Sequence, residues 1–261
     1  MDNFILNRIE EVKKNSFNIN IGDIFSRAWD IFSATAFYVI LGLILPSIIA
    51  WVINFILGLF ISIPSFVVTD TDDFSNLSAQ ILTPIALFGM GLSFFINAAL
   101  APITVSILTI AKKYDEHRNP DFNDLFIHYK DGKFGSIFLA YIAIQIITVI
   151  ATAFCVIPGV IFLVTSLFIF PFIVFSNLSV SEAIKSSFSV LWKNFGQSFL
   201  FCLASIGIFI IGGLACLVGL LVAIPLIYIG IYVFYKDVIG FEGGSNEIDQ
   251  LGNTNDYQSN Y

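Results

Sequence analysis

Charge is the scarcest property of this chain. Only 12% of its 261 residues are Asp, Glu, Lys or Arg, about half the share found in a typical soluble domain, whereas 57% are hydrophobic. So few charges cannot cover a water-exposed surface. The composition therefore argues against a soluble enzyme, a nucleic-acid-binding protein and a disordered chain, and it is typical of a helical protein that crosses a membrane several times.

Histidine and cysteine are also rare, with two and three copies. His117 and His128 have no third ligand spaced with them, so we expect no metal site and no cofactor. We expect the three cysteines to be buried thiols, although Cys155 and Cys216 both lie near the outer ends of spans, where a disulfide is the alternative. No nucleophile–base pair and no phosphate-binding glycine loop is present, so nothing in the sequence argues for an enzyme.

Four stretches contain no charged residue at all. A membrane helix needs about 20 apolar residues, so the last two stretches are each long enough for two spans and a tight turn, and the first two fit one long span each. We therefore expect an all-α, polytopic membrane helix bundle with six transmembrane helices; eight spans would leave almost no turn in the first stretch. The stretches are Ile31–Thr69, Phe74–Ala111, Phe134–Ser181 and Asn194–Tyr235.

The basic residues set the expected orientation. Six spans place both termini on one side of the membrane, and all 12 Lys and Arg residues then fall on that side. The opposite side carries only Asp70, Asp72 and Asp73, which we interpret as a solvated acidic loop and not as a calcium site. Basic loops face the cytoplasm, so the sequence predicts a multi-pass protein of the cell membrane with cytoplasmic N- and C-termini. Met1–Asp30 is charged and amphipathic, and we expect no cleaved signal peptide there.

The chain divides into three parts on this pattern. Residues 1–18 form an amphipathic cytoplasmic segment, and residues 19–240 form the six-span membrane domain. Residues 241–261 are polar and rich in Gly and Asn, so we expect a disordered cytoplasmic tail.

Three cytoplasmic segments look like copies of one unit. Each opens with a helix-capping residue that is followed three positions later by an acid, and each then shows an apolar helical stripe. We expect these helices to lie in the membrane interface or under the bundle, with Trp29 and Trp192 at headgroup depth. The cap and acid pairs are Asn20 with Asp23, Asp121 with Asp124, and Ser179 with Glu182.

A proline recurs in every second span, at Pro102, Pro171 and Pro225. The repeating unit is then an interfacial helix, a span, a turn and a returning span that contains a proline. Three copies of this unit give three helical hairpins and six spans. We expect the tight turns at Ile157–Gly159, where Pro and Gly favour a turn, and near Gly219.

Several short motifs of the chain together resemble those of a known family. The SxxEAxxxS segment from Ser179 to Ser187, the Ile-Pro-Gly sequence, Pro171, and Pro225 with the later Tyr-Lys-Asp-Val-Ile-Gly look like the integral membrane domain of glycerophosphoryl diester phosphodiesterases and its stand-alone bacterial relatives. The likeness covers residues 19–240 and implies a six-span membrane module. This chain has no room for the soluble barrel that carries the phosphodiesterase chemistry, so the resemblance transfers no activity.

Polar residues within the spans are the remaining candidates for a site. No ionisable residue interrupts the four stretches, which argues against a proton-coupled transporter. Asn97 and Gln145 are the strongest polar positions; Asn97 shares a face with Gly89, Ser93 and Ala101, which we interpret as a helix-packing face with a polar pathway as the alternative.

Two further features have competing interpretations. Tyr228, Tyr232 and Tyr235 share a face, and we interpret them as an aromatic belt at the membrane interface, with a ligand-binding stripe as the alternative. The prolines are more often simple kinks than parts of a substrate site.

The sequence thus predicts an integral membrane protein of non-catalytic function. We expect it to act through contacts with membrane lipid or with a membrane or cytoplasmic protein partner, and not with nucleic acid. The alternative, motivated by the repeats and the span prolines, is a facilitator or transporter of a neutral or lipid-like small molecule.

Overall fold

The computed structural model describes residues 3–14, 17–66 and 84–241, and these ranges are helical apart from short connections. The helices are α1 (Asn3–Lys14), α2 (Ile21–Phe66), α4 (Pro84–Asp115), the 3₁₀ helix η1 (Phe122–Phe126), α5 (Ile127–Lys130), α6 (Phe134–Phe154), α7 (Val156–Thr165), α8 (Ile169–Ser176), α9 (Val180–Lys193), α10 (Phe195–Leu214) and α11 (Cys216–Val238).

Within the described residues, six helical segments are long and apolar enough to cross a membrane. This finding confirms the all-α architecture and the expected six spans, because each segment has at least the roughly 20 residues that about 30 Å of hydrocarbon requires. The segments are Ile21–Leu59, Phe88–Asp115, Phe134–Phe154, Val156–Ser176, Phe195–Leu214 and Val218–Val238.

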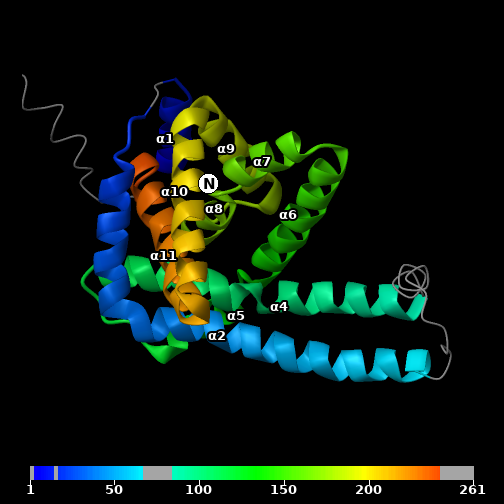
Figure 1. The fold of residues 1–261 in the computed structure, drawn as a ribbon. Coiled ribbons are helices and arrows are strands. Elements are labelled where there is room, and N and C mark those ends of the chain that lie inside the picture. The colour runs from blue at the N-terminus through cyan, green and yellow to red at the C-terminus, as the bar shows by residue number, and fades with distance from the viewer. Residues whose placement is uncertain (1–2, 15–16, 67–83, 242–261) are drawn as a thin grey trace, which may run out of the picture.

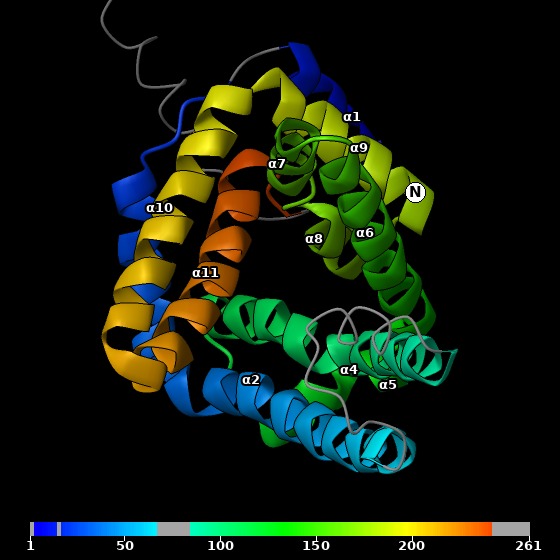
Figure 2. The same cartoon turned by 45° about the vertical axis from the view of Figure 1, so that its right-hand side comes forward.

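Consecutive spans pack against each other as pairs. Helix α2 contacts α4, α6 contacts α7, and α10 contacts α11. In both views α2 and α4 run side by side and extend beyond the other helices (Figures 1 and 2). The most apolar windows of α4 and α11 are 56% and 50% buried, against 11% for α6, so α4 and α11 form the centre of the bundle. Whether the pairs are copies of one ancestral unit stays a prediction.

The three predicted helix starts all carry the expected caps. Asn20 Oδ1 accepts a hydrogen bond from the backbone N–H of Asp23 at 3.3 Å, and Asp121 and Ser179 each form a reciprocal capping box with the acid three residues later. The first segment is not a separate interfacial helix, however. Because α2 runs unbroken from Ile21, the segment predicted to lie in the interface continues directly into the first span.

Both tight turns lie a few residues before their predicted positions. The chain reverses at the extended Cys155 between α6 and α7, and Pro158 falls in the first turn of α7, where its missing N–H costs no helical bond. The second reversal is at Ala215. Gly159 and Gly219 instead allow close packing, because a Cβ at these positions would collide with Thr152 Oγ1 and with the Gly212 carbonyl oxygen.

The fourth span is broken in two. Helix α7 ends at Thr165 and α8 begins at Ile169, so Pro171 lies in the first turn of α8 and not in the middle of a continuous span. Ser187 of α9 closes the break. Its buried hydroxyl donates to the Thr165 carbonyl oxygen at 2.6 Å and accepts from the Phe168 N–H at 3.2 Å. Two of the backbone groups freed by the break, the Thr165 carbonyl and the Phe168 N–H, are therefore satisfied within the protein.

The N-terminal helix and the end of α11 are part of the packed structure. Helix α1 buries Ile5, Ile9 and Val12 and contacts α9. Phe241, which the sequence assigned to the disordered tail, packs edge-on against Phe175 with ring centroids 5.3 Å apart. The rest of that tail, from residue 242, lies outside the described residues.

Helix α9 packs against the protein mainly with small and aliphatic side chains. Ala183, Ser187, Val190 and Leu191 are buried, whereas Phe188 and Trp192 are 45% and 49% exposed and stack on each other with centroids 5.5 Å apart. Small residues allow α9 to approach the break in the fourth span, and its large aromatic rings are left on the outside.

Candidate membrane-embedded polar cavity

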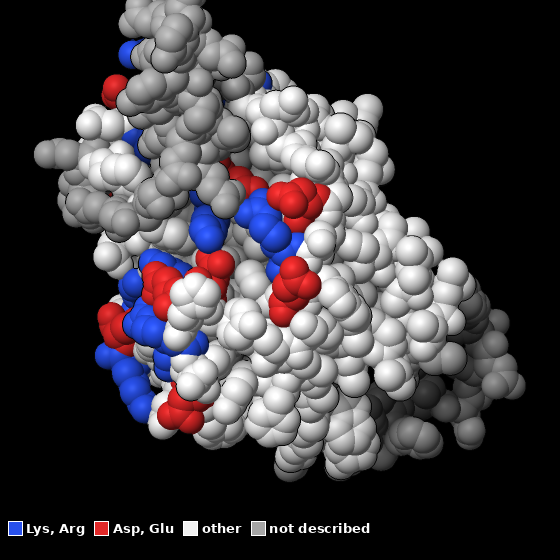
Figure 3. All heavy atoms as spheres, turned by 90° about the vertical axis from the view of Figure 1, so that its left-hand side faces the viewer, with Lys and Arg blue, Asp and Glu red and all other residues white. Residues whose placement is uncertain are grey.

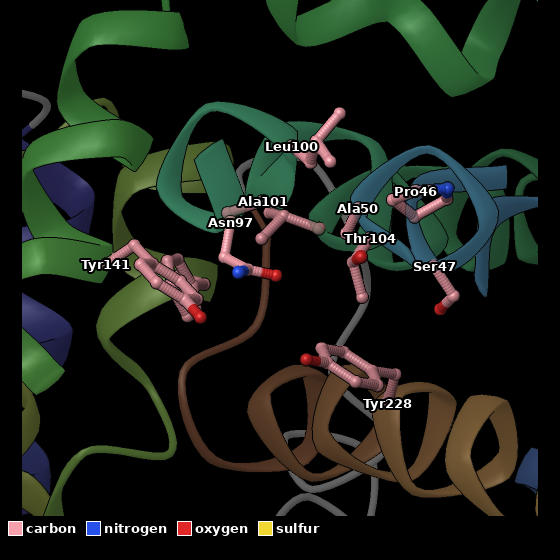
Figure 4. A pocket seen from close by; sticks show the side chains of 11 residues that line it. Pro46, Ser47, Ala50, Asn97, Leu100, Ala101, Thr104, Tyr141 and Tyr228 are labelled. Carbon is pink, nitrogen blue, oxygen red and sulfur yellow. The ribbon is translucent and has the colours of Figure 1, made fainter. Parts of the chain in front are cut away.

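A cavity of about 250 Å³ lies between α2, α4, α6, α8 and α11. The side chains of Asn97, Tyr141 and Tyr228, which come from three different helices, point toward one another across it (Figure 4). Ser47 and Thr104 add hydroxyl groups to its wall. The cavity gathers polar groups that are otherwise sparse in the charge-free spans, so we take it as the candidate site.

Asn97 lines this cavity, whereas the sequence favoured a helix-packing role for it, with a polar pathway as the alternative. Its Nδ2 donates to the Ser93 carbonyl oxygen of its own helix at 2.7 Å. One turn away, the Ser93 hydroxyl donates to Asn54 Oδ1 of α2. The face of Gly89, Ser93, Asn97 and Ala101 therefore does two things: Ser93 joins α4 to α2, and Asn97 and Ala101 line the cavity.

Gln145 reaches the cavity only through another residue. Its Nε2 donates to the Tyr141 hydroxyl at 3.1 Å, which leaves the Tyr141 O–H free to donate. Gln145 thus orients a lining residue and is not in the wall itself. Tyr141 was missed by the sequence analysis because a single tyrosine in an apolar span carries no pattern.

The three span prolines surround the cavity without lining it. All three are buried; Pro102 follows the lining residue Ala101, Pro171 follows Phe170, and Pro225 lies three residues before Tyr228. Pro46 of α2, which had not been singled out, is in the wall. A proline inside a helix leaves the carbonyl four residues earlier without its helical partner. This applies to Pro46, Pro102 and Pro225, but not to Pro171, which lies in the first turn of α8.

An apolar groove lies beside the cavity, between α2 and α11. It has a volume of about 660 Å³, and Ser47 lines both spaces. The other groove residues are large and apolar; they include Leu43, Trp51, Leu221 and Ile224. A space of this size and lining is typical of sites for apolar ligands.

The interpretation of the α11 tyrosines as an interfacial belt is wrong. Tyr232 and Tyr235 are only 1% and 0% exposed, and Tyr228 lines the cavity. The Tyr232 hydroxyl donates to Asp115 at 2.5 Å, and the hydroxyls of Tyr235 and Ser176 are hydrogen bonded at 2.6 Å. All three face inward because α11 is a central helix.

Charged side chains gather at one end of the bundle (Figure 3). There Arg27 of α2 makes two hydrogen bonds to the Asp237 carboxylate of α11, and Lys236 pairs with Asp115 of α4 at 2.7 Å. These interactions join three helices. The sequence does not reveal these pairs, because the partners are 210 and 121 residues apart along the chain.

The remaining sequence candidates do not form sites in the described residues. His117 and His128 belong to no group of three or more metal-ligating side chains within the described ranges. Cys155 is exposed, so the expectation that all three cysteines are buried is wrong for this residue, whereas Cys202 is buried. The thiol of Cys155 is free, so the alternative disulfide with Cys216 is not formed. The predicted acidic loop at Asp70, Asp72 and Asp73 lies outside the described residues.

Comparison with known proteins gives relatives but no function. No family model and no solved structure matches the chain. It is 26% identical over 228 residues to the uncharacterized protein Rv2560 of Mycobacterium tuberculosis, a match that covers 85% of this chain and 69% of the relative. The uncharacterized protein Mb2590 of Mycobacterium bovis matches with the same identity and coverage. The resemblance to the phosphodiesterase membrane domain finds no support in these matches.

Proposed function

We propose that this protein is a non-catalytic membrane module that binds a membrane lipid. The observation that carries this proposal is the apolar groove between α2 and α11. Its wall includes Ile48 and Trp51, which are 55% and 67% exposed, so the groove opens to the surroundings of the spans. An acyl chain in the groove would contact two helices at once, whereas a lipid that packs against the outside of a single helix contacts only one.

Two alternatives have less in their favour. A protein partner would need an exposed surface with a feature that distinguishes it from lipid. The exposed faces of the spans are apolar, which contact with lipid alone already explains. A transport path at the broken fourth span would use backbone groups that the break frees, and Ser187 already engages two of them, the Thr165 carbonyl and the Phe168 N–H. Lipid binding is the hypothesis with a defined site.

We also infer that the charged end is cytoplasmic. Every Lys and Arg of the chain falls on one side in a six-span arrangement, which the preference of basic residues for the cytoplasmic side explains. The likeness to the phosphodiesterase membrane domain stays a hypothesis that a clearer relative would test.

Lipid binding is tested by filling the groove. The protein is released from native membranes in mild detergent, and bound lipid is measured by native mass spectrometry. We expect Leu221→Trp to lower lipid occupancy at least about fivefold, because the indole takes space that the chain would fill. The matched control is Leu139→Trp, since Leu139 is 57% exposed on α6 and outside the groove. Equal lipid occupancy in the wild type and both variants would contradict the proposal.

A further inference from the structure

We propose that the polar cavity binds the uncharged, hydroxyl-bearing end of a neutral lipid, with diacylglycerol as the representative compound, while an acyl chain of the same molecule lies in the groove. This inference rests on the proposed function and adds to it the chemical class of the lipid. It follows from the continuity of the two spaces, the free hydrogen-bonding groups of the cavity and its lack of charge.

The groove and the cavity are two sections of one seam between α2 and α11. Ser47 lines both. On α2 the groove residue Leu43 and the cavity residue Ala50 lie one turn to either side of Ser47, and on α11 the groove residue Ile224 is followed four positions later by Tyr228 of the cavity. Residues at these spacings share a helix face, so one extended molecule can contact both sections.

The cavity wall holds hydrogen-bonding groups that the protein does not use. Outside the cavity, the hydroxyls of Thr148 and Thr165 donate to carbonyls of their own helices, as hydroxyls in spans commonly do. The Thr104 and Tyr228 hydroxyls have no hydrogen-bond partner among the described residues. A polar group in the apolar interior of a membrane costs free energy unless it is paired, and a ligand with donor and acceptor oxygens would pair these two.

The cavity has no charge to offer a ligand. None of the residues in its wall is charged. The nearby cations at the charged end are already paired, Lys113 with Asp124 at 2.7 Å and Lys236 with Asp115 at 2.7 Å. A phosphate headgroup in the cavity would be a buried charge without a counterion, which is strongly unfavourable. The lining therefore selects an uncharged polar end over an anionic one.

The cavity also has room for such a group. Its volume of about 250 Å³ is several times the roughly 30 Å³ that one water molecule takes in the liquid. The ester and hydroxyl oxygens of a diacylglycerol can accept from the Tyr141 and Tyr228 hydroxyls, and its hydroxyl can donate to the Asn97 amide oxygen, which faces the same space (Figure 4).

The test compares two lipids that differ only at the polar end. The full-length protein is placed in nanodiscs of phosphatidylglycerol with a minor fraction of diacylglycerol carrying the same acyl chains. Native mass spectrometry after release then gives the ratio of the two bound lipids relative to the bulk ratio. We expect the wild type to enrich diacylglycerol at least about fivefold. Tyr228→Phe should lower that enrichment about fivefold, the effect of one lost hydrogen bond, without reducing binding of phosphatidylglycerol.

Matched variants separate this inference from the proposed function. Tyr114→Phe, at an exposed tyrosine outside the cavity, should leave the enrichment unchanged, and Leu221→Trp should reduce both lipids. A bound ratio equal to the bulk ratio in the wild type, or an unchanged ratio in Tyr228→Phe, would overturn the inference about the headgroup, even if Leu221→Trp still lowered total lipid. Wild-type lipid occupancy that Leu221→Trp does not lower would overturn the proposed function itself.

Discussion

Burial decides the protonation state of His128, a single side chain near the charged end of the bundle. It is 1% exposed; its Nδ1 lies 2.9 Å from Asp131 Oδ2 and its Nε2 lies 3.2 Å from Thr109 Oγ1. Burial lowers the pKa of His128 below its ordinary value of 6.5, and the neighbouring Asp131 only partly offsets this effect. The neutral ring can donate from Nδ1 to the carboxylate and accept from the threonine hydroxyl at Nε2.

The lowered pKa predicts that acid destabilises the protein through this residue. Because the unfolded chain binds the proton more tightly than the folded one, the stabilisation is complete above about pH 6.5 and is lost as the pH falls from there through the folded-state pKa. Thermal unfolding in detergent should show a lower Tm at pH 5.5 than at pH 7.5. His128→Asn should remove much of this pH dependence, and His117→Asn, at an exposed histidine, should preserve it. A wild-type Tm that rises on acidification would contradict the assignment.

At the scale of elements, the break in the fourth span depends on one serine of another helix. Ser187→Ala would leave the Thr165 carbonyl and the Phe168 N–H without the partner they share. Each unpaired buried group costs about 1–3 kcal/mol, so we expect a loss of about 2–4 kcal/mol and a clearly lower Tm in detergent. Ser189→Ala is the control, because Ser189 lies on the same helix and is only half-buried. Equal unfolding temperatures for the two variants would show that the break is held by other contacts.

The same element shows what could and could not be predicted from the sequence. The capping box of Ser179 and Glu182 was predictable because both partners lie within one helical turn. The partners of Ser187 are 19 and 22 residues away, across a break that exists only because the helices pack as they do. Composition predicted the six spans, whereas the cavity required knowing which faces of α2, α4, α6 and α11 meet.

The prolines and tyrosines also show the difference between features that lie within one helix and features that depend on its neighbours. Pro102 and Pro225 were recognisable as recurring span prolines, but their position beside a cavity depends on neighbours in other helices. The α11 tyrosines were misassigned because an aromatic face near a span end looks the same whether it meets lipid or protein. Their burial follows from the central place of α11, which is a property of the whole bundle.

At the scale of the whole molecule, the charges and the helix lengths together predict which ends are accessible from each side of the membrane. Helix α6 has 21 residues, and at 1.5 Å per residue it carries the chain about 30 Å from Lys133, at its start, to Cys155. If the charged end is cytoplasmic, the exposed Cys155 lies at the outer surface. In a variant with Cys202→Ser and Cys216→Ser, a membrane-impermeant maleimide should therefore label Cys155 in intact cells.

The matching variant carries its one cysteine at the charged end. Asn119→Cys, in the exposed connection between α4 and η1 and combined with Cys155→Ser, Cys202→Ser and Cys216→Ser, should be labelled only after the membrane is permeabilised. If Asn119→Cys is labelled in intact cells and Cys155, in its own variant, is not, the orientation is the opposite of the one predicted. Six spans would still stand in that case, because their number follows from hydrophobic length and the orientation follows from charge. The groove between α2 and α11 would also be unaffected, since its lining depends on the packing of these two helices and not on which end faces the cytoplasm.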